Sequence, residues 1–129
     1  MSNVSLCASA LTIAASSQFD FQSNPVRTIA ENGEIWFVAK DVALALDYSQ
    51  SSVNQIVNLF RNVPNEWKGI KPINTLGGEQ KLLMISEQGL YFFLGRSDKP
   101  KALPFQKWLA GEVLPVIRKT GAYIHAQAM

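Results

Sequence analysis

The sequence contains very few of the residues that usually carry covalent chemistry or bind metals. Among its 129 residues there is one cysteine, Cys7, and one histidine, His125. A single cysteine cannot form a disulfide within the chain, and these two residues cannot supply the four ligands of a structural zinc site. Glycine-rich phosphate loops and nucleophile-elbow motifs are also missing from the sequence. We therefore expect no enzymatic activity, no metal site and no cofactor.

Charged residues and long apolar runs are scarce as well. Only 17% of the residues are charged, 47% are hydrophobic, and the formal net charge is +2. This balance is typical of a folded domain and excludes disorder over most of the chain. The apolar runs are too short, or too often broken by charges, to cross a bilayer. We expect one soluble, intracellular domain that does not associate with membranes.

The charges that are present divide unevenly along the chain. Residues 1–60 hold two basic and five acidic side chains, whereas residues 61–129 hold ten basic and five acidic ones. A basic half can contact phosphate, although an excess of this size also fits an ordinary solvated surface. An unkinked helix would place Lys107 and Arg118 on one side, because eleven residues make about three turns. The candidates for phosphate contact are Arg96, Lys99, Lys101, Lys107, Arg118 and Lys119.

The first eighteen residues carry no charged side chain. Residues 4–15 resemble the apolar segment of a secretory signal, but the basic residues that precede such a segment are missing. We expect residues 1–18 to be a variable lead-in that is either flexible or adds an edge strand. The folded domain is expected to span residues 19–123, with a tail over residues 124–129.

Two turn sequences predict β-hairpins. Asn32-Gly33 lies between apolar segments at 26–30 and 34–38, and both residues suit the positive φ angles of a two-residue hairpin turn. Gly77-Gly78 lies between the segments 70–76 and 79–85. Pro72 restricts the first of these to an edge or to a position that donates no hydrogen bond.

Helical spacing follows each predicted hairpin. After the first, a short helix is expected over residues 40–46, and a second begins near Ser49 with one apolar stripe of Val53, Ile56, Val57 and Phe60. After the second, Ser86 is expected to cap a helix, and a last helix runs over residues 101–119 with a kink at Pro115. The order predicts a single compact α+β domain of two hairpins, each followed by short helices.

Residues 40–61 have the length and rhythm of a helix-turn-helix. The outward face of the second helix carries amide and guanidinium groups that can bond base edges, and serines at its start can donate to phosphate. The same residues are also common on a helix face that is simply solvated. The candidates on this face are Ser51, Ser52, Asn54, Gln55, Asn58 and Arg61.

Three segments in this order resemble the Bro-N domain of baculovirus repeated-ORF proteins and phage antirepressors. They are FVAKDVALALDY (37–48), MISEQGLY (84–91) and FQKWLAGEVLPVIRKTGAY (105–123), and the resemblance covers residues 19–123. In this family a glycine usually stands at the position of Asp47, where aspartate can still adopt a left-handed conformation. Family members usually carry a further C-terminal domain, so this chain resembles the module alone or a shortened version.

The resemblance implies a non-catalytic regulator of transcription from a phage or prophage, acting in the cytoplasm of a bacterial host. We expect it to bind double-stranded DNA through the basic C-terminal half and the helix at 51–61. The alternative is an antirepressor that sequesters a phage repressor, or another regulatory protein, by protein contact without binding DNA. The sequence leaves the DNA target, the partner and a possible homo-oligomer open.

Overall fold

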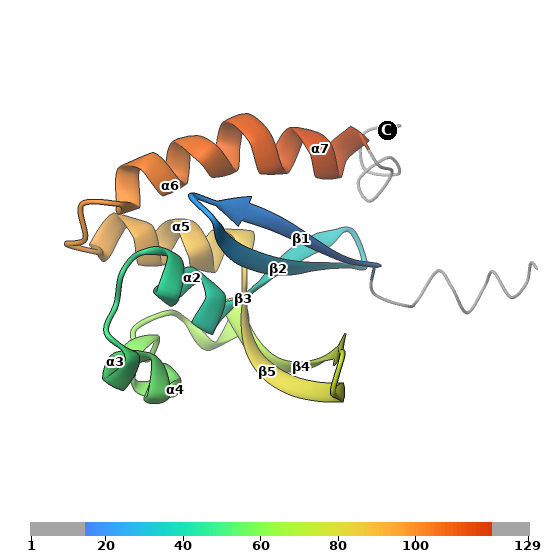
Figure 1. Ribbon diagram of the computed structural model, residues 1–129, viewed down its shortest axis with the longest axis horizontal. Coiled ribbons are helices and arrows are strands. Elements are labelled where there is room, and N and C mark those ends of the chain that lie inside the picture. The colour runs from blue at the N-terminus through green and yellow to red at the C-terminus, as the bar shows by residue number, and fades with distance from the viewer. Residues whose placement is uncertain (1–14, 120–129) are drawn as a thin grey trace, which may run out of the picture.

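A computed structural model of the chain describes residues 15–119, with side chains described for residues 17–118. Five strands form one antiparallel sheet in the order β1-β2-β3-β5-β4, and helices cover one of its faces (Figure 1). This architecture confirms the predicted α+β fold. Residues 1–14, with Cys7, and residues 120–129, with His125, lie outside the described part, as does the predicted tail. Within that part, no helix is long and apolar enough to span a membrane.

The strands and helices alternate in groups along the chain. The strands are β1 (Ala15–Phe21), β2 (Asn24–Glu31), β3 (Glu34–Val38), β4 (Lys68–Thr75) and β5 (Gly78–Ser86). The first group of helices comprises α2 (Ala39–Ala45), α3 (Gln50–Asn54), α4 (Ile56–Leu59) and the 3-10 turn η1 (Asn65–Trp67). The second comprises α5 (Glu87–Arg96), α6 (Ala102–Trp108), the π-helical turn η2 (Leu109–Val113) and α7 (Leu114–Lys119).

Both predicted hairpins form. Asn32 and Gly33 adopt φ angles of +54° and +80° between β2 and β3, as the primed turn requires, and Gly78 adopts +108° after the turn between β4 and β5. A third hairpin joins β1 to β2 through Gln22 and Ser23, which also have positive φ. Residues 15–18 of the predicted lead-in therefore belong to an edge strand of the sheet.

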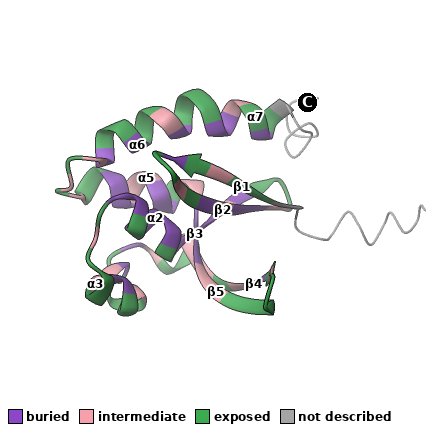
Figure 2. Cartoon of the chain, viewed as in Figure 1, coloured by how far each residue is buried: buried purple, intermediate pink, exposed green. Residues whose placement is uncertain are grey.

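The apolar strand β3 is covered on both faces, as its sequence predicts. Ile35 and Phe37 point into the larger core, which the sheet forms with α2, α5, α6, η2 and α7. Val38 and the partly buried Trp36 belong to a smaller cluster on the opposite face. Figure 2 shows the buried residues concentrated along β2, β3 and the helix faces that meet them.

The sheet curls, so that β4 approaches β2 although β3 and β5 lie between them in the strand order. Ile29 of β2 and Ile73 of β4 share the smaller cluster, and the Lys71 Nζ lies 2.9 Å from the Glu31 Oε1. Pro72 lies on β4, which is one of the two edge strands of the sheet, as its missing N–H predicts.

The last helix is interrupted before Pro115, where the sequence predicts a kink. Its hydrogen-bond pattern widens to a π-helical turn at Leu109–Val113, which ends two residues before Pro115. A π turn is one way of relieving a proline that cannot donate to the preceding turn. The widened turn also changes the helical phase between Lys107 and Arg118, so their eleven-residue spacing no longer corresponds closely to three whole turns.

The predicted second helix is wrong in its detail. Instead of one continuous helix, α3 and α4 are separated at Gln55, whose φ and ψ are −111° and 50°. Val53 and Phe60 are buried, but Val57 is 65% exposed. The break rotates the second half of the stripe, so that Leu59 packs against the core in place of Val57.

Candidate nucleic-acid interface

The helices α3 and α4 form a projecting corner of the molecule, apart from the sheet (Figure 1). Four of the predicted base-contacting residues meet on this corner. They line a hollow of ≈ 440 Å³, which we call the α4 hollow, and its lining residues are Asn54, Gln55, Ile56, Val57, Asn58 and Arg61. The arrangement gathers side-chain amides and a guanidinium, which are groups that bond base edges.

The inner side of the corner is anchored firmly in the core. Phe60 is fully buried and stacks on Phe93 of α5, with ring centroids 4.1 Å apart. Ile56 and Leu59 pack against the same core from partly buried positions. The hollow is therefore presented by a segment whose orientation is fixed by aromatic packing.

The serines at the start of α3 bond one another and the backbone. The Ser49 Oγ accepts a hydrogen bond from the Ser52 backbone N–H at 3.2 Å and lies 3.1 Å from the Ser51 Oγ. Ser49 is thus the N-cap of α3. Ser51 and Ser52 serve this local network, while Asn54 accepts a hydrogen bond from the Gln50 side chain at 3.0 Å.

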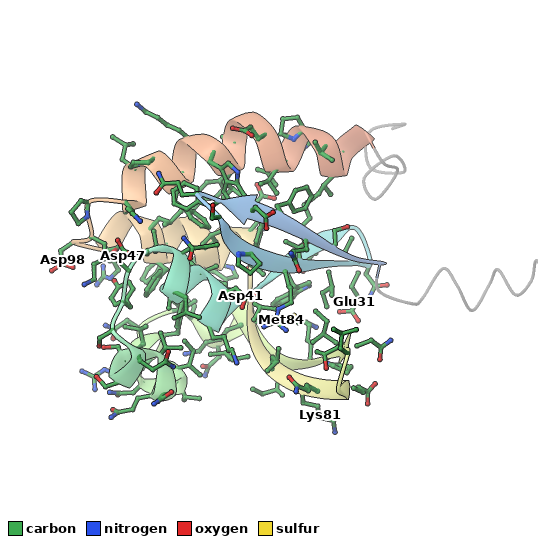
Figure 3. The ribbon with its side chains drawn as sticks, viewed as in Figure 1. Glu31, Asp41, Asp47, Lys81, Met84 and Asp98 are labelled. Atoms are coloured by element: carbon green, nitrogen blue, oxygen red, sulfur yellow. The ribbon has the colours of Figure 1, made fainter. Side chains whose placement is uncertain are left out.

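The segment 96–101, which we call the basic loop, lies against the turn between α2 and α3. The Lys101 Nζ is 3.1 Å from the Asp47 Oδ2, and the Lys99 Nζ lies 4.8 Å from the centre of the Tyr48 ring. The Tyr48 hydroxyl is 2.9 Å from the Ser97 Oγ. Figure 3 shows Asp47 and Asp98 at this end of the molecule.

Asp47 adopts a φ of +71°, the left-handed conformation that the family resemblance predicts for this position. Its carboxylate is 62% exposed, so it is a negative charge beside the cations of the basic loop. Through its ion pair with Lys101 it offsets part of their positive field.

A pocket of ≈ 150 Å³ lies beside the basic loop. Its lining includes Leu59 and Asn62 from the α4 side and Arg96 and Ser97 from the basic loop. The Arg96 guanidinium lies 4.9 Å from the centre of the Phe92 ring and remains exposed. Arg96 and Asn62, the residue after Arg61, thus line one pocket, and Lys99 and Lys101 follow Arg96 in the basic loop. We call Arg61, Arg96, Lys99 and Lys101 the candidate surface.

Of the other basic candidates, Arg118 lies apart from the candidate surface. Arg118 approaches Glu87 at the first turn of α5, at 3.9 Å, whereas Arg96 is the last residue of the same helix. Ten helical residues separate these two ends by about 15 Å. Lys107 is exposed on α6, and Lys119 ends α7 with a side chain outside the described atoms.

One basic residue of the surface is missing from the sequence prediction. Lys68, the first residue of β4, donates to the backbone carbonyl of Phe60 at 2.9 Å and approaches that of Arg61 at 3.4 Å. A cation near the last carbonyls of a helix stabilises that end. Only the fold brings Lys68 there, because six residues, including the turn η1, lie between it and Arg61.

Asp41 is not a surface charge that faces this interface. Its side chain is 7% exposed and accepts hydrogen bonds from the Arg27 side chain. The hydrogen bond to Asp41 raises the pKa of Arg27, against the opposing effect of burial. The pair is internal to the fold, so neither charge attracts or repels a bound phosphate strongly.

Amide and guanidinium side chains can bond base edges, and clustered lysines and arginines can contact phosphate. The chain belongs to the BRO family: the model of the BRO family N-terminal domain, Bro-N, matches residues 25–115. This is a family of DNA-binding regulatory domains of phage type.

A relative in Haemophilus influenzae, described as an uncharacterized protein, is 38% identical over 108 residues. The match covers 83% of this chain and 52% of the relative, so the chain spans about half the length of that protein. No solved structure matches the chain.

Proposed function

We propose that this chain is the DNA-binding module of a phage or prophage regulator, and that it contacts duplex DNA with the α4 hollow and the basic loop. The supporting observation is that one pocket is lined both by Asn62, which follows Arg61 of the hollow, and by Arg96 and Ser97 of the basic loop. In this arrangement the loop contacts phosphates and sets the orientation, while the hollow faces base edges. Such a role is carried out in the cytoplasm of the bacterial host.

The experiment is a titration of the protein against duplex DNA at two salt concentrations. Phosphate contacts release counterions, so affinity is expected to fall steeply as salt rises, with a slope of about 0.9 per contact on a double logarithmic plot. Absence of binding to any duplex at low salt would exclude the proposal.

Matched variants test the location of the interface. Arg96→Ala and Lys99→Ala are expected to weaken binding and to reduce the salt slope by about one unit each. Lys81→Ala removes the same charge from the exposed part of β5, which Figure 3 shows away from the basic loop. It should leave both quantities unchanged. An equal loss in all three variants would contradict the placement.

The second candidate function is sequestration of a phage repressor by protein contact. It is favoured by one observation, the exposure of the aliphatic Val57 within the α4 hollow. The test is to recover binding partners from a lysogen with the wild-type protein and with Val57→Asp. This function is supported over the first if the wild type recovers an identified repressor, the variant does not, and the wild type does not retard DNA.

A further inference from the structure

Val57 is an aliphatic side chain held outward at the centre of the candidate interface. It is 65% exposed, although it lies in an apolar stretch of sequence. Its neighbours Ile56 and Leu59 turn inward and pack on the core, which fixes the direction of α4. The exposure of Val57 is thus a consequence of the break at Gln55 and of the packing on either side of it.

The surroundings of Val57 indicate what it would meet in a complex. Asn54, Gln55, Asn58 and Arg61 line the same hollow. An amide side chain can bond the N6 and N7 atoms of adenine, and on the same major-groove edge the paired thymine presents its O4 atom and then its C5 methyl group. An amide and a neighbouring aliphatic group can therefore contact the adenine and the thymine of one A·T pair.

Valine suits this task because its side chain is stiff. Branching at Cβ leaves few χ1 rotamers, so its methyl groups are positioned before DNA arrives. Contact between Val57 and a base methyl would remove both apolar groups from water. Burial of one methyl group corresponds to a gain of about fourfold in affinity.

We propose that Val57 is a specificity-determining residue that recognises the C5 methyl group of a pyrimidine in the major groove. This inference rests on the proposed DNA-binding function. Thymine and 5-methylcytosine carry the same methyl group, and the experiment separates them.

The experiment begins with selection of duplexes from a random pool by the wild-type protein at low salt. Each thymine of the selected site is then replaced by deoxyuridine, which removes only the methyl. We expect at least one position at which binding weakens about fourfold. Val57→Ala should bind the thymine and deoxyuridine duplexes equally.

Val116→Ala is the matched control, because Val116 is also exposed but lies on α7. It should discriminate deoxyuridine as the wild type does. At the position where deoxyuridine weakens binding, a duplex with cytosine should bind weakly. The same duplex with 5-methylcytosine should recover part of the affinity. If cytosine methylation changes the affinity and no thymine replacement does, the recognised methyl group is that of 5-methylcytosine.

Failure of this inference is distinguishable from failure of the proposed function. A selected duplex could bind with normal salt dependence, with an affinity that no deoxyuridine replacement and no cytosine methylation changes. That result would overturn the role of Val57 only. The same holds if Val57→Ala remains sensitive to the methyl. No enrichment of any duplex would overturn the DNA-binding function itself, and capture of a repressor dependent on Val57 would assign the residue to a protein contact.

Discussion

Arg27 holds the carboxylate of Asp41 through both its backbone and its side chain. The Arg27 backbone N–H and Nε donate to the Asp41 Oδ2 at 3.0 and 2.7 Å, and Nη2 donates to Oδ1 at 2.9 Å. The two residues tie β2 to the first turn of α2, fourteen positions along the chain. This two-pronged geometry is specific to arginine.

Removing either partner of this pair should destabilise the fold. Asp41→Ala leaves a largely buried guanidinium without its carboxylate, and we expect a loss of about 2–4 kcal/mol in the free energy of unfolding. Arg27→Lys retains the charge but cannot form the paired bonds, so it should also lose stability, by less than Arg27→Ala. Urea denaturation of the variants measures these losses of stability. If Arg27→Lys is as stable as the wild type, the paired hydrogen-bond geometry is dispensable.

Gly89 lies where a side chain has no room. A Cβ at this position would stand 2.8 Å from the backbone oxygen of Trp67 and 3.3 Å from the Val63 side chain. Gly89→Ala should therefore cost about 1–3 kcal/mol, because backbone must move. Gly95→Ala is the control in the same helix, where no atom lies within 4 Å of the added Cβ. It should leave stability unchanged or raise it by up to about 1 kcal/mol.

The charge of Asp47 should limit DNA affinity. Asp47→Asn keeps a residue that tolerates positive φ, removes the negative charge and releases Lys101. We expect tighter DNA binding and a steeper salt dependence, by up to about one phosphate contact. Stability should change by less than about 1 kcal/mol, since the Asp47 side chain is 62% exposed. Glu34→Gln, at the exposed first residue of β3, removes the same charge and should leave binding unchanged.

Tyr91 should lose its hydroxyl proton at a higher pH than a free tyrosine. Burial raises its pKa, the carboxylate of Glu87 raises it further, and Arg118 lowers it. In an absorbance titration, Glu87→Gln should lower the pKa of Tyr91 and Arg118→Gln should raise it, with Tyr91→Phe identifying the signal. The unfolded chain loses this proton first, so the contribution of Tyr91 to stability falls as pH rises above about 10. Opposite shifts in the two variants would contradict the charge arrangement.

The elements that the sequence predicts correctly are those set by local chemistry. Asn32-Gly33 specifies its turn by the positive φ that both residues tolerate, and Ser86 caps α5 through the Gly89 N–H at 3.2 Å. The hairpin between β1 and β2 escapes this reasoning, because Gln22 and Ser23 are unusual in such a turn. The Asn24 side chain supports it instead, by donating to the carbonyls of Phe21 and Gln22.

The site was less predictable, because it depends on contacts between distant segments. The amide side chains at residues 54–58 could be selected from their spacing. The inward packing of Leu59 in place of Val57 could not, since it follows from a helix break that no glycine or proline marks. The approach of the basic loop to Tyr48 joins residues about fifty positions apart, and Lys68 reaches the end of α4 only through the fold.

Pro72 gives the edge strand β4 a property that affects how these molecules behave at high concentration. The free edge of a sheet is a template on which another chain can add a strand, and a row of regularly spaced N–H donors makes that addition favourable. At the middle of β4 this row is interrupted, because Pro72 has no N–H. A second molecule that met this edge would find its hydrogen-bond ladder broken halfway along, which disfavours strand-by-strand polymerisation while leaving the native pairing with β5 intact.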